Sequence, residues 1–194
     1  RRRPERAYRP GIDPRAGYML REGAIANANA MVFDKAAQDP QSMGGMGTTV
    51  CLAIVSGETA YIASVGDSRA YLVRGQELRQ LTVDHTQAQL LFDRGELSRE
   101  ELDHHPARNS LTRAVGVAAA VAADYTQCRL EPGDALLLCS DGLYSMVDPT
   151  TLRECARQSV SQEDSKCLID AANSRGGRDN ITAVIIWYEE NRNG

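Results

Sequence analysis

The first regular pattern along the chain is helical. Between residues 18 and 38, apolar side chains recur at three- and four-residue spacing, and Asp39-Pro40 ends the run. A segment rich in glycine and methionine follows and leads into short apolar runs that are joined by tight turns. These runs predict three consecutive strands in an antiparallel meander, at residues 48–55, 59–65 and 69–73.

The rest of the chain alternates between polar helical segments and further apolar runs. Residues 84–94 predict a helix, and Ser98 with Glu101 forms a capping box for a second short helix. Asp148-Pro149 begins a third helix, and a second capping box at residues 161–164 begins a fourth. Further strands are predicted at residues 121–129, 135–139 and 181–188. This order predicts an α+β fold in which helices flank mainly antiparallel sheets.

The composition is that of an ordinary globular protein, because 42% of the 194 residues are apolar and 25% are charged. The length predicts one domain at residues 18–189, between an irregular arm rich in arginine and proline (1–17) and a polar tail (190–194). The net charge of -4 gives no support to nucleic-acid binding. No apolar run approaches the ~18 residues of a membrane span, and the first residues contain no secretory signal.

Five cysteines are spread along the chain without a CxxC pair, and their number is odd. Cys51 and Cys139 lie inside apolar runs, as small core residues do. This pattern favours reduced thiols and therefore a cytoplasmic protein.

Three aspartates stand in glycine- or serine-rich turns at the ends of apolar runs. Asp67 and Asp141 follow their runs, and Asp179 precedes the last one. In an antiparallel sheet the end of one strand lies beside the start of its neighbour, so all three carboxylates are expected at one end of one sheet. Carboxylates that close repel one another unless a cation compensates them. Hard divalent cations such as Mg²⁺ and Mn²⁺ select oxygen ligands of this kind, so the pattern predicts a metal site.

The sequence gives less support to a zinc site, a serine hydrolase or a nucleotide-binding protein. Each aspartate turn taken alone is an ordinary turn sequence. His104 and His105 are adjacent and lack zinc-site spacing. The chain contains no nucleophile elbow and no phosphate-binding glycine loop. Arg69 and Arg178 lie close to the key aspartates, and two interpretations stay open: each binds an anion such as phosphate, or each pairs with a neighbouring carboxylate.

Seven motifs carry a resemblance to a known family. They are GTT at 47–49, VGDSRAY at 65–71, LTVDH at 81–85, LTRAVG at 111–116, PGD at 132–134, LCSDGL at 138–143 and GGRDNIT at 176–182. With these motifs in this order, the chain resembles the metal-dependent protein phosphatases (PPM, type 2C), and among them the compact bacterial branch. The resemblance covers about residues 20–188.

The resemblance implies a β-sandwich flanked by helices, with Mg²⁺ or Mn²⁺ at one end activating a water that hydrolyses phosphoserine or phosphothreonine. It implies that Asp141 and Asp179 are ligands of the central metals and that Asp67, with Asp141, holds an additional one. Asn180 and Gly142 are expected beside this cluster, and residues 84–109 as a flap over it. The implied partners are a phosphorylated protein substrate and, by family analogy, a serine/threonine kinase, with no nucleic acid and no membrane.

The family's opening motifs are absent from residues 1–46. These motifs, an Arg before Asn-Glu-Asp and an Asp-Gly-x-Gly-Gly turn, supply the phosphate-binding arginine and the aspartate that bridges the central metals. Two explanations stay open. The chain is a C-terminal portion of a phosphatase with impaired activity, or it is an inactive phosphatase-like binding or regulatory module. The missing first strands are expected to leave an apolar sheet edge exposed.

Overall fold

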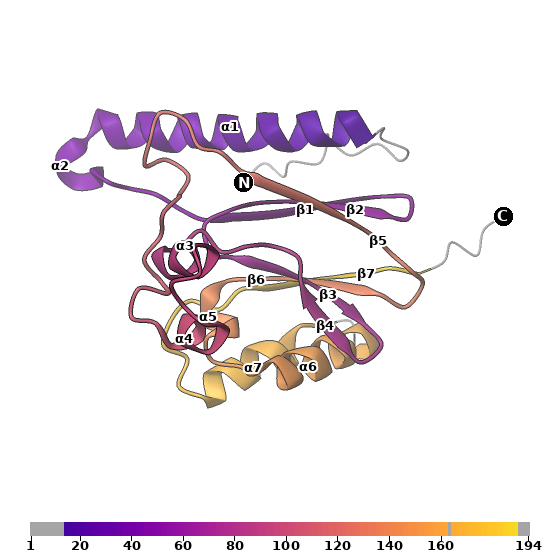
Figure 1. Cartoon of the computed structure of the whole chain (residues 1–194). Helices are drawn as coiled ribbons and strands as arrows, with labels where there is room; N and C mark the ends of the chain where they lie inside the picture. Colours follow the sequence, from indigo (N-terminus) through magenta and orange to yellow (C-terminus); the bar gives the residue numbers. More distant parts are fainter. Residues whose placement is uncertain (1–13, 163, 190–194) are drawn as a thin grey trace.

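The computed structural model describes residues 14–162 and 164–189, which form two facing β-sheets with helices on both outer sides (Figure 1). The first sheet has the order β1-β2-β5 and the second has the order β4-β3-β6-β7. All pairings are antiparallel. The strands are β1 (Val50–Ser56), β2 (Thr59–Val65), β3 (Arg69–Arg74), β4 (Glu77–Gln80), β5 (Asp124–Arg129), β6 (Ala135–Cys139) and β7 (Ala183–Trp187). The expected α+β class and flanked sandwich are confirmed.

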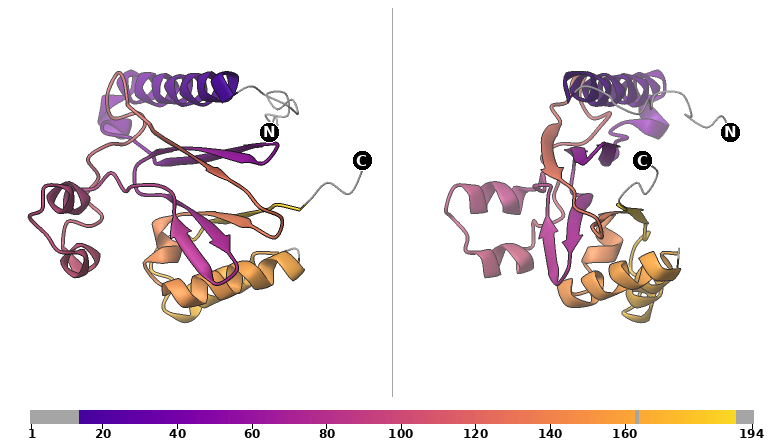
Figure 2. Two further views of the ribbon diagram at one scale, coloured as in Figure 1. Left: turned by 45° about the vertical axis from the view of Figure 1, so that its right-hand side comes forward. Right: turned by 90° about the vertical axis from the view of Figure 1, so that its right-hand side faces the viewer.

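The helices form two outer layers and one projecting pair. The long first helix covers the outer face of the first sheet, and the last two cover the outer face of the second (Figure 1). A pair of short helices projects at one end of the sandwich (Figure 2). The helices are α1 (Pro14–Gln38), α2 (Pro40–Met43), α3 (Gln87–Asp93), α4 (Arg99–His104), α5 (Asp141–Tyr144), α6 (Pro149–Gln162) and α7 (Lys166–Ser174).

Apolar clusters fill the three spaces between these layers. Ile62, Leu72 and Leu136 are among the buried residues between the two sheets. Ile25 of α1 packs on the first sheet, and Leu168 of α7 packs on the second. Full burial of each such side chain contributes about 1.5–3 kcal/mol. Strand β2 is buried along nearly its whole length, which explains its unbroken apolar run from Ala60 to Ala63 in place of an alternating pattern.

The predicted three-strand meander is wrong. Strands β1 and β2 form a hairpin in the first sheet, but the turn after β2 carries the chain into the second sheet, where β3 pairs with β4 and β6. Gly66 makes this crossing possible, because its φ is +99° and a Cβ there would lie 2.4 Å from the Thr49 side chain. The sequence also missed β4, a short strand with polar residues that lies at the sheet edge.

Several predicted helix boundaries shift for local reasons. Helix α1 begins at Pro14, four residues before the predicted start, and the arm before it lies outside the described residues. Helix α3 begins only after Thr86, whose hydroxyl caps it. The capping box of Ser98 and Glu101 is confirmed, with both of its hydrogen bonds formed. The second predicted box is wrong, because α6 continues through residue 162 and α7 begins after Ser165.

Two of the five cysteines form a disulfide, so the expectation of reduced thiols is wrong for this pair. Cys155 of α6 and Cys167 of α7 are bonded, with their Cα atoms 5.4 Å apart where the two helices pack together. Cys51, Cys128 and Cys139 are free, and burial raises the pKa of Cys51 and of Cys139 to about 12. Within the described residues, no helix is long and apolar enough to cross a membrane.

Candidate functional site

The sheet register brings the three key aspartates to one end of the second sheet. Arg69 of β3 lies opposite Cys139 of β6, which lies opposite Ala183 of β7. Asp67 therefore stands just before β3, Asp141 just after β6, and Asp179 in the loop before β7. Asp67 lies at this end because it precedes β3, which belongs to the second sheet. Strand β2, which the sequence analysis took as its strand, belongs to the first sheet. The geometry needed for a shared acidic site follows from strand order alone.

The turn at Asp141 is packed tightly against the loop before β7. The Ser140 hydroxyl donates to the Asn180 carbonyl oxygen and accepts from the Thr182 amide, both at 3.0 Å. Gly142 follows Asp141 directly, and a Cβ added to it would lie 2.4 Å from the Asn180 carbonyl oxygen. Only glycine lets the two segments approach so closely. Gly142 and Asn180 therefore set the spacing between the Asp141 and Asp179 turns through backbone contact.

Asp67 carries negative charge that the protein compensates only in part. The residue is 7% exposed, and no ion pair to it occurs in the described part of the chain. Its burial first, and then the charges of Asp141 and Asp84, raise its pKa to about 6. A buried carboxylate with another carboxylate next to it, here Asp67 and Asp141, is the kind of oxygen ligand set that binds a hard divalent cation.

The set of acidic ligands is incomplete among the described residues. No group of three or more His, Cys, Asp or Glu side chains there is arranged to hold a metal ion. Asp179 is exposed, and its Oδ1 accepts a hydrogen bond of 2.7 Å from the following amide, that of Asn180. Asp141 Oδ1 accepts similarly from the Gly142 amide at 2.9 Å. The donor chemistry of Asp67 and Asp141 fits a divalent metal, whereas the Asp179 side chain is not drawn into a three-carboxylate cluster.

Arg69 contacts a carboxylate that the sequence analysis gave no role. Its Nε and Nη2 donate to both oxygens of Asp84, at distances down to 2.6 Å, and its guanidinium lies 3.7 Å from the centre of the Tyr144 ring. Burial alone would lower the pKa of Arg69, but the hydrogen bonds to Asp84 outweigh it and raise the pKa. Arg178 is exposed and makes no hydrogen bond or ion pair with the described residues.

A cleft of about 830 Å³ opens beside the acidic end. Its lining includes Arg69 and Asp84, residues of the projecting helices α3 and α4, and Tyr144 with the start of α6. The Tyr144 hydroxyl donates to the Asp67 carbonyl oxygen at 2.9 Å. This hydrogen bond connects the cleft wall to the acidic turn. None of the three key aspartates lines the cleft itself, so it adjoins the acidic end only through residues such as Arg69 and Tyr144.

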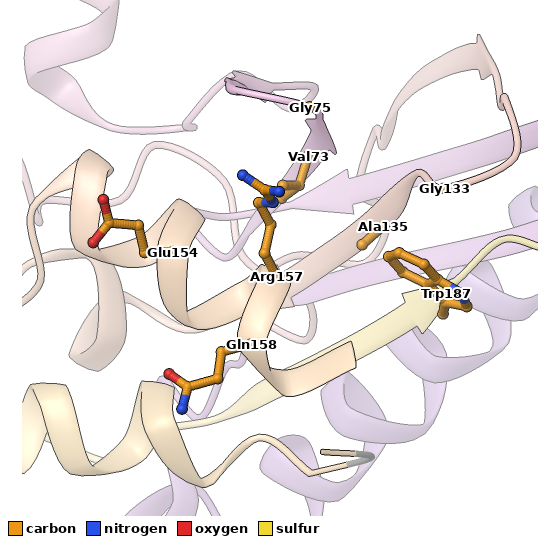
Figure 3. Close-up of a pocket in the computed structure, with 8 residues that line it drawn as sticks. All are labelled: Val73, Gly75, Gly133, Ala135, Glu154, Arg157, Gln158 and Trp187. Atoms are coloured by element: carbon orange, nitrogen blue, oxygen red, sulfur yellow. The ribbon is translucent and has the colours of Figure 1, made fainter. Parts of the chain in front are cut away.

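A second cavity, of about 530 Å³, lies at the opposite end of the same sheet. Its walls include Val73, Ala135 and Trp187 at the far strand ends, and Arg157 and Gln158 of α6 (Figure 3). This cavity lies at the strand ends farthest from the key aspartates, so it has no part in the acidic site.

The sequence analysis also missed a buried network behind the Asp67 turn. His85 is 3% exposed and contacts Gly66 and Asp124. Asp124 in turn is bound by Arg113 at 2.6 Å. The only sequence signal for Asp84 and His85 is the motif LTVDH at residues 81–85, and this motif does not indicate which contacts they make.

Comparisons with known proteins agree with this geometry. The family model described as Protein phosphatase 2C matches residues 16–181. The chain is 40% identical over 159 residues to a serine/threonine phosphatase stp of Listeria monocytogenes, a match that covers 81% of this chain and 63% of that protein. The chain thus spans less than two thirds of the length of this relative.

Solved structures show the same arrangement. The serine/threonine phosphatase Stp1 from Staphylococcus aureus superposes with a TM-score of 0.85 at 29% identity, covering 94% of this chain and 72% of Stp1. The catalytic domain of the phosphatase PstP, solved in complex with two manganese ions, superposes with a TM-score of 0.78 at 33% identity. That match covers 91% of this chain and 72% of PstP.

Proposed function

Because the chain belongs to the protein phosphatase 2C family, we propose that it takes part in hydrolysing phosphoserine and phosphothreonine in proteins. Enzymes of this family use divalent metals. The observation that supports the proposal best is the buried Asp67 carboxylate beside Asp141, which has no ion pair in the described residues and whose pKa is raised by burial and by that neighbour. A metal ion placed there would relieve the repulsion and serve phosphoester hydrolysis.

We propose Mg²⁺ or Mn²⁺ as the cation, held by Asp67, Asp141 and Asp179. When bound, such a metal supplies an activated water and neutralises charge on the phosphoryl group. The remaining roles belong to the chain itself. Gly142 and Asn180 hold the two carboxylate turns together, and the Arg69–Asp84 pair stiffens the lining of the cleft. Arg178, exposed and unpaired in the described structure, is available to a phosphate or a carboxylate.

The activity of this chain alone is proposed to be weak. The acidic set is incomplete in the described residues, and a metal held by fewer carboxylates binds less tightly. The same observation favours the second candidate, a phosphatase-like module that binds a partner without catalysis. In both cases the proposed partner is a phosphorylated protein, with a serine/threonine kinase as a further candidate.

The cytoplasm is the proposed location. The three free cysteines support it, and the Cys155–Cys167 disulfide counts against it.

The test is hydrolysis of p-nitrophenyl phosphate and of a phosphothreonine peptide with Mn²⁺ or Mg²⁺, comparing the chain with Asp141→Asn. We expect slow turnover that requires metal, falls to background in the variant, and stays far below that of the Listeria phosphatase measured alongside. Turnover that is independent of metal or unchanged by Asp141→Asn would contradict the phosphatase proposal. Metal binding without any turnover would support the non-catalytic module, and turnover equal to the relative's would exclude impairment.

A further inference from the structure

His85 is a buried titratable side chain that the proposed chemistry leaves without a role. It lies between three segments that are distant in sequence: the turn after β2, the segment after the projecting helices, and the start of β5. The His85 carbonyl oxygen accepts from the Thr112 amide at 2.8 Å. Its other hydrogen bonds and its ion-pair contact within the described residues are with Gly66 and Asp124.

Both backbone groups of Gly66 are bound by this one residue. The His85 amide donates to the Gly66 carbonyl oxygen at 2.9 Å, and the Gly66 amide donates to His85 Nδ1 at 3.0 Å. On its other side Gly66 touches Thr49, which leaves no room for a side chain. The residue that precedes Asp67 is thus fixed from two directions. A shift of the His85 ring would release the amide and rotate the Asp67 backbone.

The far side of the ring faces a carboxylate. Since Nδ1 accepts the Gly66 amide, the proton of the neutral ring is on Nε2. Nε2 lies 3.1 Å from Asp124 Oδ2, although its angle falls short of a well-formed hydrogen bond. Burial alone would raise the pKa of Asp124, but the hydrogen bond from Arg113 and the close contact with His85 outweigh it and lower the pKa. An ionised Asp124 favours a proton on the nitrogen that faces it.

We propose that His85 is a positioning residue, whose Nδ1 holds the Gly66 amide and so orients the Asp67 carboxylate for its metal. Asp124, held by Arg113, keeps the ring in the tautomer that can accept this amide. The proposal rests on the proposed function only in taking Asp67 as a metal ligand.

Two substitutions separate positioning from simple packing. In His85→Asn the amide oxygen occupies nearly the place of Nδ1 and still accepts from Gly66, but the contact with Asp124 is lost. In His85→Gln the longer side chain reaches toward Asp124 and fills more of the ring's volume, but it leaves no acceptor at the Nδ1 position. A packing role predicts that the smaller Asn is the more damaging change, and a positioning role predicts that Gln is.

The first measurement is made on the metal-free, ¹⁵N-labelled chain by NMR. We expect a nitrogen–nitrogen coupling across the Gly66 N–H···Nδ1 hydrogen bond in the wild type, and slow hydrogen exchange of the Gly66 amide in the wild type and in His85→Asn. Exchange of this amide should be at least about 10-fold faster in His85→Gln. Absence of the coupling in the wild type overturns the proposal, even if both variants fail to fold.

The second measurement is Mn²⁺ affinity by calorimetry. We expect a loss on the order of 10-fold for His85→Gln and a smaller loss for His85→Asn, as for residues that orient metal ligands elsewhere. Equal losses, or a greater loss for Asn, would overturn the positioning role. If the wild type binds no Mn²⁺, the proposed function fails, while the NMR comparison still decides whether His85 fixes the turn.

Discussion

Replacing Asp67 with asparagine should stabilise the metal-free chain at neutral pH. Burial, and then the charges of Asp141 and Asp84, raise the pKa of Asp67 from 3.8 to about 6. A carboxyl group with a higher pKa in the folded state binds protons more tightly there than in the unfolded chain. The free energy of unfolding therefore rises as the pH falls from about 6 toward about 4, and the cost of ionising Asp67 is fully present above that window. About 2 pH units at about 1.4 kcal/mol each give about 3 kcal/mol.

Urea unfolding in EDTA at about pH 4 and about pH 7.5 tests this magnitude. Asp67→Asn should exceed the wild type by up to about 3 kcal/mol at the higher pH and match it at the lower. Asp179→Asn is the control, since this carboxylate is exposed and its change should stay within about 0.5 kcal/mol. With Mn²⁺ added, the wild type should gain stability and Asp67→Asn much less. An Asp67→Asn protein no more stable than wild type at the higher pH would refute the reasoning.

Three further predictions concern packing, a buried charge and the sheet edges. Gly142→Ala should lower the free energy of unfolding by about 1–3 kcal/mol and weaken Mn²⁺ binding, because the added methyl group would clash with the Asn180 carbonyl oxygen. The control is Gly23→Ala at an open helical position, which should raise the free energy of unfolding by about 0.5–1 kcal/mol in the same urea assay. Arg74→Met should cost about 3–5 kcal/mol in urea unfolding by leaving the buried Asp134 unpaired, and adding Asp134→Asn should recover much of it. Strands β1 and β7 each pair on one side only within the described residues, so the chain should self-associate in sedimentation experiments. A monomer with a sharp cooperative melt would contradict that last expectation.

Local sequence signals predicted most elements but not how the sheets divide. The strand at residues 59–65 and the strand at residues 135–139 have the predicted ends, because their apolar runs and turn residues are encoded locally. The meander failed because β3 pairs with β6, more than sixty residues away in the chain, and no local signal distinguishes that partner from β2. The Cys155–Cys167 pair was missed for the same reason, since it depends on how α6 and α7 pack.

The site divides in a similar way. The three aspartates could be found from turns that adjoin apolar runs, because a carboxylate at a buried strand end is costly without a purpose. The residues that support the three aspartates could not be found from the sequence. Asp84, His85 and Asp124 are recognisable only once the segment before α3 and the start of β5 lie beside the turn after β2. Such contacts are tertiary, and polar residues in them look like ordinary turn residues in the sequence.

The turn at residues 66–68 explains why fold and chemistry are difficult to separate in this chain. It is the passage between the two sheets, so its backbone must cross the sandwich, and Gly66 is the residue that permits this. The same crossing places Asp67 in a buried position beside Asp141, where its charge opposes folding. A turn selected for stability alone would carry an uncharged residue there. If Asp67 is a metal ligand, as we propose, this turn is the position where stability is given up for metal chemistry.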